Sequence, residues 1–268
     1  MSEMRRTFVD ENVNVVYDNQ AKTKTDDKND LRFLDNVDEG VSNVDMNRWQ
    51  SAQKYEKKTW MELCRHTSDD RNYEHAGRFD NYDSLIAYVN ENKITDMKMV
   101  ELGCGPFTNS RVILEKIPDV NLNITLLDPL LNDYLNHPNC FYKSKMINGK
   151  LVETHSIPIE KFEQKENEYD ILLMNNVIEH CYDVNLIFEK ILSMLKPGGI
   201  IVFSDVYFYK KDMEELLEKR YDTGHPLKLS EKLINIFTNN FEVLYNEDFH
   251  GLYGESWRND KYFIGTKK

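Results

Sequence analysis

From Lys98 onward, short apolar runs alternate with stretches in which apolar residues recur every three or four positions. The short runs are typical of strands buried in a sheet, and the longer spacing is typical of helices that cover a sheet. This alternation predicts an α/β fold with a mostly parallel sheet and helices on both faces. We expect strands at Met99–Gly103, Asn123–Asp128, Leu151–His155, Tyr169–Asn175, Gly199–Asp205, Phe241–Asp248 and Lys261–Thr266.

Two turns that contain glycine set the ends of some of these elements. Asn148-Gly149 is a strong signal for a two-residue hairpin, so the strand at Leu151–His155 is expected to have an antiparallel companion at Phe141–Met146. Lys196–Gly199 follows the helical pattern of Val184–Leu195. The proline and glycines of that segment predict the end of the helix and a turn into the next strand.

The region between Asp45 and Asn92 also has a helical pattern. Asp45 suits the N-cap of a first helix, and Tyr82–Asn90 is predicted to form a second one. We interpret residues 45–97 as a helical lid that precedes the main domain, residues 98–268. The side chains that share one face of the first helix are Trp49, Ala52, Gln53, Glu56, Trp60 and Leu63.

Residues 1–44 are rich in Asp, Asn, Lys and Thr, and their apolar residues keep neither period for long. This composition is typical of a flexible or loosely packed arm. Two interpretations stay open from the sequence. The arm is either simply disordered, or it is a flap or homodimer contact that becomes ordered when something binds.

Composition and charge narrow the classes of function. The 268 residues are 40% hydrophobic, and 34 Lys+Arg against 46 Asp+Glu give a net charge of −12. An acidic protein repels phosphate backbones and anionic lipids, so we expect no nucleic-acid and no membrane partner. No run approaches the ~20 apolar residues of a membrane-spanning helix, and the charged N-terminus does not suit a secretion signal. We therefore expect a cytoplasmic protein, with its four cysteines reduced.

A glycine turn directly follows the first predicted strand. Gly103 and Gly105 flank Cys104 there, and glycines allow a sharp turn and a close approach of a ligand to the backbone. Asp128 lies 23 residues after Gly105, at the end of the next predicted strand. A carboxylate at that place suits hydrogen bonds from two ribose hydroxyls. The combination predicts a nucleoside cofactor at the carboxyl edge of the sheet.

Charge indicates which cofactor this is. A pyrophosphate site needs a third glycine at a helix N-terminus, but Thr108 occupies that position and follows Phe107. Glu101 lies two residues before Gly103, and its negative charge would repel a pyrophosphate. The same charge suits the ammonium and sulfonium groups of S-adenosylmethionine. We therefore favour this cofactor, with S-adenosylhomocysteine as its product, over a nicotinamide dinucleotide.

At these motifs, and over residues 98–268, the sequence resembles the class I S-adenosylmethionine-dependent methyltransferases. The family's first motif corresponds to Glu101–Gly105, and its ribose acid corresponds to Asp128. Its fourth-strand motif corresponds to Tyr169–His180, and the motif after the next helix to Leu195–Gly199. Phe107 stands where the family usually has a small residue. The resemblance implies a Rossmann-like, seven-stranded sheet with an antiparallel last strand, and an enzyme that transfers methyl groups.

A second resemblance concerns the acceptor. Arg48–Glu56, Asp128–Tyr134 and His225-Pro226 look like segments of methyltransferases encoded in bacterial surface-polysaccharide and capsule gene clusters. This resemblance implies O-methylation of a small metabolite, a sugar or a capsule-polysaccharide precursor, phosphorylated ones included. Three alternatives stay open: an N-methyltransferase of an amine metabolite, a methyltransferase of a protein side chain, and a methyltransferase-like binding subunit without activity.

Further residues are expected to hold the cofactor. Asn175, at the end of the fourth strand, is predicted to contact its amino-acid part, mainly through its backbone carbonyl, unless it only caps the next helix. The resemblance places polar contacts to adenine at the end of the third strand, with Ser156 or His155 as the candidate, and Pro129 is also expected to bind the cofactor. On the lid, Gln53 lies beside the aromatic stripe, and Arg78 is expected to pair with the carboxylate of the cofactor.

Methyl transfer to an alcohol requires loss of the hydroxyl proton. His180 and His225 are the candidate bases because histidine titrates near neutrality, although a structural role stays open for each. Glu179-His180-Cys181 does not predict a metal site, because neighbouring side chains on a helix point about 100° apart and no second cluster supplies the missing ligands. We expect no metal; a divalent cation that assists O-methylation is the one alternative.

Overall fold

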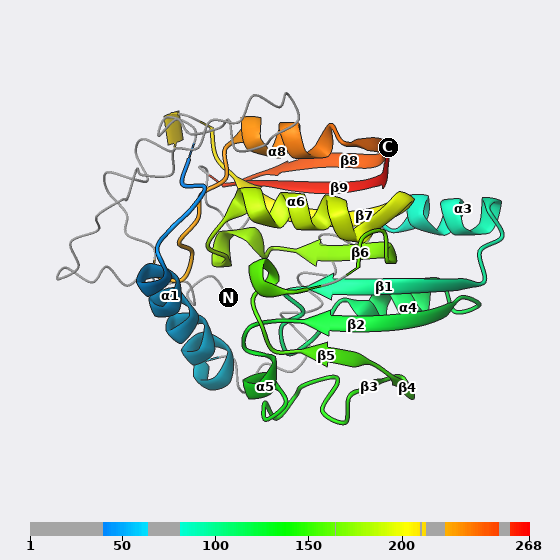
Figure 1. The fold of residues 1–268 in the computed structure, drawn as a ribbon, viewed down its shortest axis with the longest axis horizontal. Coiled ribbons are helices and arrows are strands. Elements are labelled where there is room, and N and C mark those ends of the chain that lie inside the picture. Colours follow the sequence, from blue (N-terminus) through cyan, green and yellow to red (C-terminus); the bar gives the residue numbers. More distant parts are fainter. Residues whose placement is uncertain (1–39, 64–80, 164, 210, 213–222, 252–257) are drawn as a thin grey trace.

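The computed structural model of the chain describes residues 40–63, 81–163, 165–209, 211–212, 223–251 and 258–268. Within this part, seven strands form one sheet in the order β5-β2-β1-β6-β7-β9-β8 (Figure 1). The first five run parallel, and β9 is antiparallel to both β7 and β8. The predicted Rossmann-like fold is confirmed, including its antiparallel last strand. The strands are β1 (Asp96–Leu102), β2 (Asn121–Leu127), β5 (Glu153–His155), β6 (Tyr169–Asn175), β7 (Leu195–Tyr207), β8 (Phe241–His250) and β9 (Asn259–Lys267), with a separate pair β3 (Met146–Ile147) and β4 (Lys150–Leu151).

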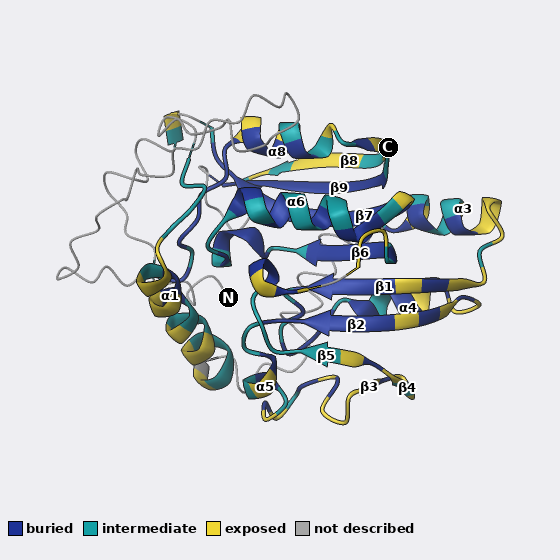
Figure 2. Cartoon of the chain, in the orientation of Figure 1, coloured by how far each residue is buried: buried dark blue, intermediate teal, exposed yellow. Residues whose placement is uncertain are grey.

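Helices cover both faces of the sheet, and each face has its own hydrophobic cluster. α6 (Val184–Met194) and α8 (Glu231–Thr238) contribute to one cluster, and α3 (Asp83–Glu91) and α4 (Ser110–Lys116) contribute to the other. Successive side chains of a strand point to opposite faces, so β6 supplies both clusters in alternation. Because the central strands are buried on both sides (Figure 2), their sequences are continuous apolar runs.

A hairpin is present at the predicted turn, but its first strand is only Met146–Ile147 and not Phe141–Met146, and it does not belong to the main sheet. Its turn residues Asn148 and Gly149 have positive φ angles of 48° and 81°, which suit a tight two-residue turn. The prediction of one strand over Leu151–His155 is wrong. The N–H of Val152 donates to the carbonyl of Lys145 (2.9 Å), and this contact separates the hairpin from the three residues that join the sheet as β5.

Strand β7 begins earlier than the sequence predicts. Leu195 follows α6 directly and pairs with Tyr169 at the start of β6. The pairing then shifts at a bulge, and Gly198 has a φ of 71°. Lys196–Gly199 is therefore an irregular start of the strand rather than a separate turn, because glycine absorbs a bend that other residues rarely adopt.

The two predicted N-terminal helices have different positions. α1 (Met46–Lys58) begins after the predicted N-cap Asp45, whose carboxylate accepts hydrogen bonds from two backbone N–H groups, and it continues into η3 (Thr59–Leu63). α1 lies beside the carboxyl ends of the strands (Figure 1). α3 packs instead on one face of the sheet. Of the lid predicted for residues 45–97, only α1 and η3 have the position of a lid within the described residues.

Only the end of the predicted N-terminal arm lies within the described residues. Val41 forms a β-bridge with Lys228, and Asn43 forms one with Asp183, so residues 40–44 lie against the main domain. The rest of the arm, residues 1–39, lies outside the described part. In the helices that are described, none combines the length and the apolar character needed to cross a membrane.

Candidate active site

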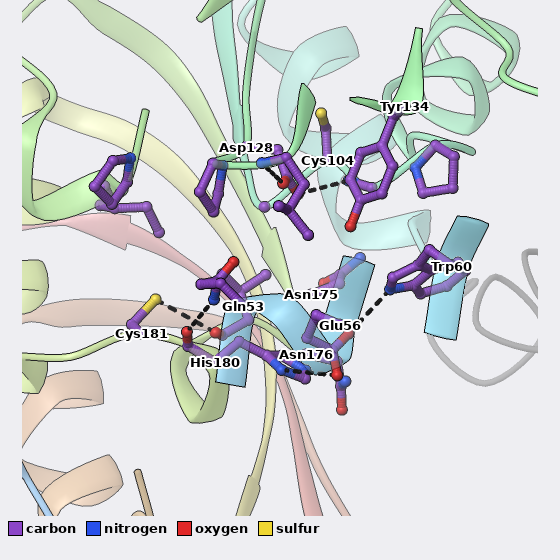
Figure 3. Close-up of a pocket in the computed structure, with 18 of the residues that line it drawn as sticks. Gln53, Glu56, Trp60, Cys104, Asp128, Tyr134, Asn175, Asn176, His180 and Cys181 are labelled. Atoms are coloured by element: carbon purple, nitrogen blue, oxygen red, sulfur yellow. Dashed lines mark hydrogen bonds and ion pairs between the residues drawn. The ribbon is translucent and has the colours of Figure 1, made fainter. Parts of the chain in front are cut away.

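The carboxyl ends of β1, β2 and β6 surround an open cavity of about 920 Å³ (Figure 3). The strand order reverses between β1 and β6, and open α/β sheets bind their ligands at such a point. α1 and η3 contribute the wall that faces these loops. The lining residues are Trp49, Gln53, Glu56 and Trp60, the loop from Gly103 to Asn109, Asp128, Pro129, Leu130 and Tyr134, then Pro158, Ile159, Glu160, Asn175, Asn176, Val177, His180 and Cys181.

The turn after β1 needs its two glycines for different reasons. Both have positive φ angles, 68° at Gly103 and 54° at Gly105. A β-carbon on Gly103 would lie 2.5 Å from the side chain of Val177, so the loop after β6 packs directly on this glycine. A β-carbon on Gly105 would meet nothing within 4 Å, and this residue lines the cavity. Gly105 therefore leaves room for a ligand to approach the backbone.

Glu101 does not line the cavity, contrary to the expectation that its charge faces the cofactor. Its side chain is buried, and its carboxylate accepts hydrogen bonds from the hydroxyls of Thr108 and Ser110 and from the N–H groups of Asn109 (2.8 Å) and Ser110 (2.9 Å). Burial raises the pKa of Glu101, and these hydrogen bonds oppose that shift. The residue fixes the turn that leads into α4 and leaves no oxygen facing a ligand.

Asp128 lies in the cavity at the end of β2. One carboxylate oxygen accepts a hydrogen bond from the N–H of Gly105 (3.1 Å) and the other from the N–H of Leu130 (2.8 Å). Burial raises the pKa of Asp128 to about 7; the two hydrogen bonds oppose this shift, and the charges of Glu56 and Glu101 add to it. Each oxygen can accept a further hydrogen bond, as two ribose hydroxyls would provide. This geometry fits the predicted ribose contact.

Pro129, Ser156 and Arg78 were also predicted to bind the cofactor, and they differ in their position relative to the cavity. Pro129 lines the cavity. Ser156 does not: its hydroxyl donates to the carbonyl of Pro129 (3.2 Å) and accepts from the N–H of Asn132 (3.2 Å). It supports the loop after β2, and the following residues, such as Ile159, line the cavity instead. Arg78 lies outside the described residues.

Asn175 and Asn176 follow β6, and both line the cavity. The side-chain oxygen of Asn175 accepts a hydrogen bond from the hydroxyl of Ser204 on β7 (3.1 Å). Asn176 has a positive φ of 58°, and its N–H donates to the carbonyl of Ser204 (2.7 Å). The side-chain oxygen of Asn175 is thus already bound. The predicted contact through the backbone carbonyl of Asn175 is compatible with this arrangement and stays a prediction.

Asp205 holds the backbone of this turn in place. This role of Asp205 was not predicted from the sequence. The residue is buried, and one carboxylate oxygen accepts hydrogen bonds from the N–H groups of Val177 (3.1 Å) and Ile178 (2.7 Å). Burial, together with the charge of Glu179, raises the pKa of Asp205 to about 7. The sequence feature that could have identified Asp205 is an acid at the end of an otherwise apolar run.

α1 is fastened to the loop after β6. The indole N–H of Trp49 (3.1 Å) and the side-chain amide of Gln53 (2.9 Å) both donate to the backbone carbonyl of His180. The Lys57 ammonium lies 2.6 Å from the carboxylate of Asp133 in α5 (Leu131–Tyr134). Gln53 thus lines the cavity as predicted, but its amide nitrogen already holds the lid to the domain (Figure 3).

The rings of the two histidines proposed as bases are in contact; His180 lines the cavity, whereas His225 is not among its lining residues. The ring centroids of His180 and His225 are 4.6 Å apart. His180 Nδ1 lies 3.1 Å from the carbonyl of Gly224, which can only accept, so Nδ1 carries a proton. Two acids complete the cluster. Glu56 Oε1 lies 3.6 Å from His180 Nδ1, and Glu179 Oε1 lies 3.5 Å from His225 Nε2 and 4.0 Å from His180 Nε2.

Glu179 is ionised in this cluster. Burial opposes its charge, but the positive charges of His225, His180, Lys228 and Arg258 hold its pKa at about 2. The sequence placed Glu179 next to His180 but gave no sign that Glu56 approaches them from α1. The cluster combines buried negative charge with two imidazoles that ordinarily titrate near neutrality.

Comparison with known families places this chain in one of them. The model of a methyltransferase domain family matches residues 73–241, which is more than half of the chain. The chain belongs to the methyltransferase domain family. The matched segment of this methyltransferase includes the glycine turn, Asp128 and both histidines, whereas α1 with Glu56 lies before it.

Individual relatives of this methyltransferase are distant. It is 28% identical over 154 residues to malonyl-[acyl-carrier protein] O-methyltransferase 2 of Ilyobacter polytropus, which is 56% of each chain. It is 24% identical over 111 residues to a ubiquinone biosynthesis O-methyltransferase of Rhodopseudomonas palustris, 41% of this chain and 40% of that one. The chain thus spans about half the length of these curated relatives.

The fold is also that of a solved methyltransferase structure. N-methyltransferase NodS of Bradyrhizobium japonicum, crystallised in complex with S-adenosyl-l-homocysteine, superposes with a TM-score of 0.53 at 15% identity. The superposition covers 82% of this chain and 98% of NodS. At this identity, the likeness shows a shared fold.

Proposed function

We propose that this protein transfers the methyl group of S-adenosylmethionine to a hydroxyl group of a small acceptor. The observation that carries the proposal is one cavity that holds the buried carboxylate of Asp128 and the open side of Gly105, with the His180–His225 pair at its edge. Asp128 and Gly105 suit a ribose-bearing cofactor. The histidine pair suits an acceptor that must lose a proton.

The residues present fit the cofactor. The cavity is lined by apolar side chains together with a few polar groups, as small-molecule sites are. Asp128 would hold the ribose, and Gly105 leaves room for close approach to the backbone. Leu130 and Ile159 offer apolar surface to the adenine, and the backbone at Asn175 would hold the amino-acid part. NodS, which has the same fold, was crystallised with the product form of this cofactor.

When bound, S-adenosylmethionine supplies an electrophilic methyl carbon: a carbon–oxygen bond forms while the carbon–sulfur bond breaks and its electron pair stays on sulfur. The chain's own residues position the acceptor and take its hydroxyl proton. In neutral His180, Nδ1 donates to Gly224, so Nε2 is the basic nitrogen. His225 Nε2 faces the same Glu179 oxygen. One of these imidazoles takes the proton, and ionised Glu179 stabilises the imidazolium that results.

The proposed acceptor is a sugar or a capsule-polysaccharide precursor, phosphorylated ones included. The support is the likeness of three segments of the sequence to capsule-cluster methyltransferases. Trp60 and Phe107 also line the cavity, with ring centroids 5.9 Å apart, and such rings suit the apolar face of a sugar. Two curated relatives carry the name O-methyltransferase.

A transfer assay tests this proposal. Labelled S-adenosylmethionine is incubated with the full chain and with free sugars, nucleotide-linked sugars, phosphorylated precursors and amine metabolites. We expect label in a hydroxyl-bearing product, and a rate at least about tenfold lower for His180→Asn or His225→Asn, because general bases typically contribute 10²–10⁴-fold. Label in amine products alone would overturn the hydroxyl acceptor.

An amine acceptor is the second candidate, and one observation favours it. Two acids, Glu56 and Glu160, line the cavity and would attract a cationic amine. NodS, an N-methyltransferase, shares the fold. The amine arm of the same assay decides between the two acceptors.

A further inference from the structure

The lining of the cavity is acidic. Three carboxylates belong to it, those of Glu56, Asp128 and Glu160, and within the described part of the chain no lysine or arginine does. Carboxylates that share a poorly hydrated space repel one another unless a group of opposite charge lies between them. The cavity therefore favours a ligand that brings positive charge with it.

Glu56 is the acid that the protein supports least. Asp128 and Glu160 each accept hydrogen bonds from two backbone N–H groups. Among the described residues, the carboxylate of Glu56 accepts a single hydrogen bond, from the indole N–H of Trp60 to Oε2 (3.1 Å). The side chain of Glu56 is only 12% exposed, so water solvates its charge poorly. A charge in this situation is stabilised when a cation binds beside it.

Neutral His180 does not supply this cation. Glu56 Oε1 lies 3.6 Å from His180 Nδ1, but the proton on that nitrogen is donated to the carbonyl of Gly224 (3.1 Å). A base must be neutral before it takes a proton, so its ring brings no charge to Glu56 at that stage. Gly224 also packs against Oε1, since a β-carbon there would lie 2.8 Å from this oxygen. The carboxylate of Glu56 is thus held in place without a cationic partner.

The position of Glu56 suits the sulfur atom of the cofactor. In S-adenosylmethionine, this sulfur is bonded to the ribose portion on one side and carries the methyl group that is transferred. Asp128 would hold the ribose, and the methyl group must face an acceptor within reach of His180. Glu56 lies side by side with His180 (Figure 3), and its charge adds to the shift that burial causes in the pKa of Asp128. It is therefore close to the groups that would hold both neighbours of the sulfur.

We propose that Glu56 pairs with the sulfonium charge of S-adenosylmethionine, so that the cavity selects the methyl donor over its product. This role rests on the cofactor of the proposed function. The donor carries one more positive charge than S-adenosylhomocysteine, in which the sulfur is a neutral thioether. Once the methyl group has left, the attraction to Glu56 is lost, and the product dissociates more readily.

Glu56 also fills the role that the sequence assigned to Glu101. The prediction of a cationic cofactor depended on an acid that faces it, but both oxygens of Glu101 are bound by the turn that leads into α4. The acid that does line the cavity comes from α1, before the glycine turn. The lid thus contributes charge to the cofactor site in addition to covering it.

Calorimetric titrations of three ligands test this role without an acceptor. S-adenosylmethionine, S-adenosylhomocysteine and sinefungin, in which a carbon with a charged amino group replaces the sulfonium, are titrated into the full chain. At pH 8, above the pKa of Asp128 of about 7, the ribose acid is ionised. In Glu56→Gln, affinity for the two cationic ligands should fall at least about tenfold, whereas affinity for S-adenosylhomocysteine should change by less than about threefold.

Two further variants sharpen the comparison. Glu62→Gln removes the same charge from an exposed position of η3 and should leave all three affinities unchanged. Trp60→Phe keeps an aromatic ring but removes the hydrogen bond that orients Glu56, so it should lower the preference for the cationic ligands several-fold. Binding of S-adenosylhomocysteine by each variant shows that the fold and the cofactor site are intact.

The outcomes separate this role from the proposed function. Equal loss of affinity for S-adenosylmethionine and S-adenosylhomocysteine in Glu56→Gln would overturn the pairing with the sulfonium, because the two ligands share every other charge. Unchanged affinities in Glu56→Gln would overturn it as well. Both results leave the proposed function standing, since the wild type still binds the cofactor. Wild-type protein that binds none of the three ligands would overturn the role and the proposed function together.

Discussion

At the scale of single residues, the proposed ribose contact of Asp128 depends on the ionisation of its carboxylate. Its carboxylate must be charged to accept two ribose hydroxyls, but in the free protein burial raises its pKa to about 7, with Glu56 and Glu101 as the acids that add to the shift. The protonated form therefore dominates below that pH. We therefore expect binding of the cofactor to release this proton, and the affinity to fall as the pH falls below about 7.

The first prediction is a pH dependence of S-adenosylhomocysteine binding. Affinity should be constant well above pH 7 and fall by up to about tenfold per pH unit below it. Calorimetry in buffers of different ionisation enthalpy should detect proton release below pH 7. Asp128→Asn should bind at least about tenfold more weakly at pH 8, because it loses charged hydrogen bonds, and should lack this slope. The same slope in Asp128→Asn would show that another group is responsible.

The two glycines of the turn after β1 give the second prediction. Gly103→Ala forces a β-carbon against Val177 and a positive φ on alanine, so the free energy of unfolding should fall by about 2–4 kcal/mol. In Gly105→Ala the new methyl group meets open space, so the free energy of unfolding should fall by only about 1 kcal/mol, the cost of a positive φ on alanine. The same methyl group would project into the cavity, so cofactor binding should weaken. Denaturant unfolding and calorimetry measure the two effects.

A double variant serves as the control for this pair. Gly103→Ala with Val177→Ala removes the clash and should recover part of the lost stability. Equal stability of Gly103→Ala and Gly105→Ala would contradict the close packing between the two loops.

At the scale of elements, α1 closes the cavity through hydrogen bonds that converge on one backbone carbonyl. Trp49 and Gln53 both donate to His180, so the lid is fastened to the loop that carries the proposed base. Each such bond contributes about 1 kcal/mol. The element is therefore held firmly where it meets the active site.

The third prediction concerns this attachment. Gln53→Ala should weaken S-adenosylhomocysteine binding by several-fold and increase hydrogen exchange in α1, with a change in global unfolding free energy of about 1 kcal/mol or less. Lys57→Ala is the matched control, because its ion pair with Asp133 is exposed on both sides (52% and 37%) and should contribute little. Unchanged exchange in α1 of Gln53→Ala would show that other contacts hold the lid.

At the scale of the whole molecule, the net charge of −12 gives a fourth prediction. Duplex DNA and RNA should show no saturable binding at about 0.15 M salt, because the long-range field repels their phosphates. Fluorescence anisotropy of a labelled duplex measures this directly. Saturable binding that weakens steeply with salt would contradict the expectation.

The sequence was sufficient for the sheet but not for contacts between distant segments. Strand-like runs predicted β1, β2, β6, β8 and β9 closely, although β8 is mostly exposed, and the spacing of Gly105 and Asp128 predicted a cofactor site at the carboxyl edge. The prediction that the charge of Glu101 faces the cofactor failed, because the sequence does not show that neighbouring hydroxyls and N–H groups bind both oxygens of its carboxylate. The approach of Glu56 and His225 to His180 depends on tertiary packing, so local patterns carried no sign of it.

The most direct test of the central claim is a calorimetric titration of S-adenosylmethionine into the full-length protein at pH 8. We expect one binding site per chain, with affinity at least about tenfold weaker in Asp128→Asn. No heat of binding by correctly folded wild-type protein at high micromolar cofactor would contradict it.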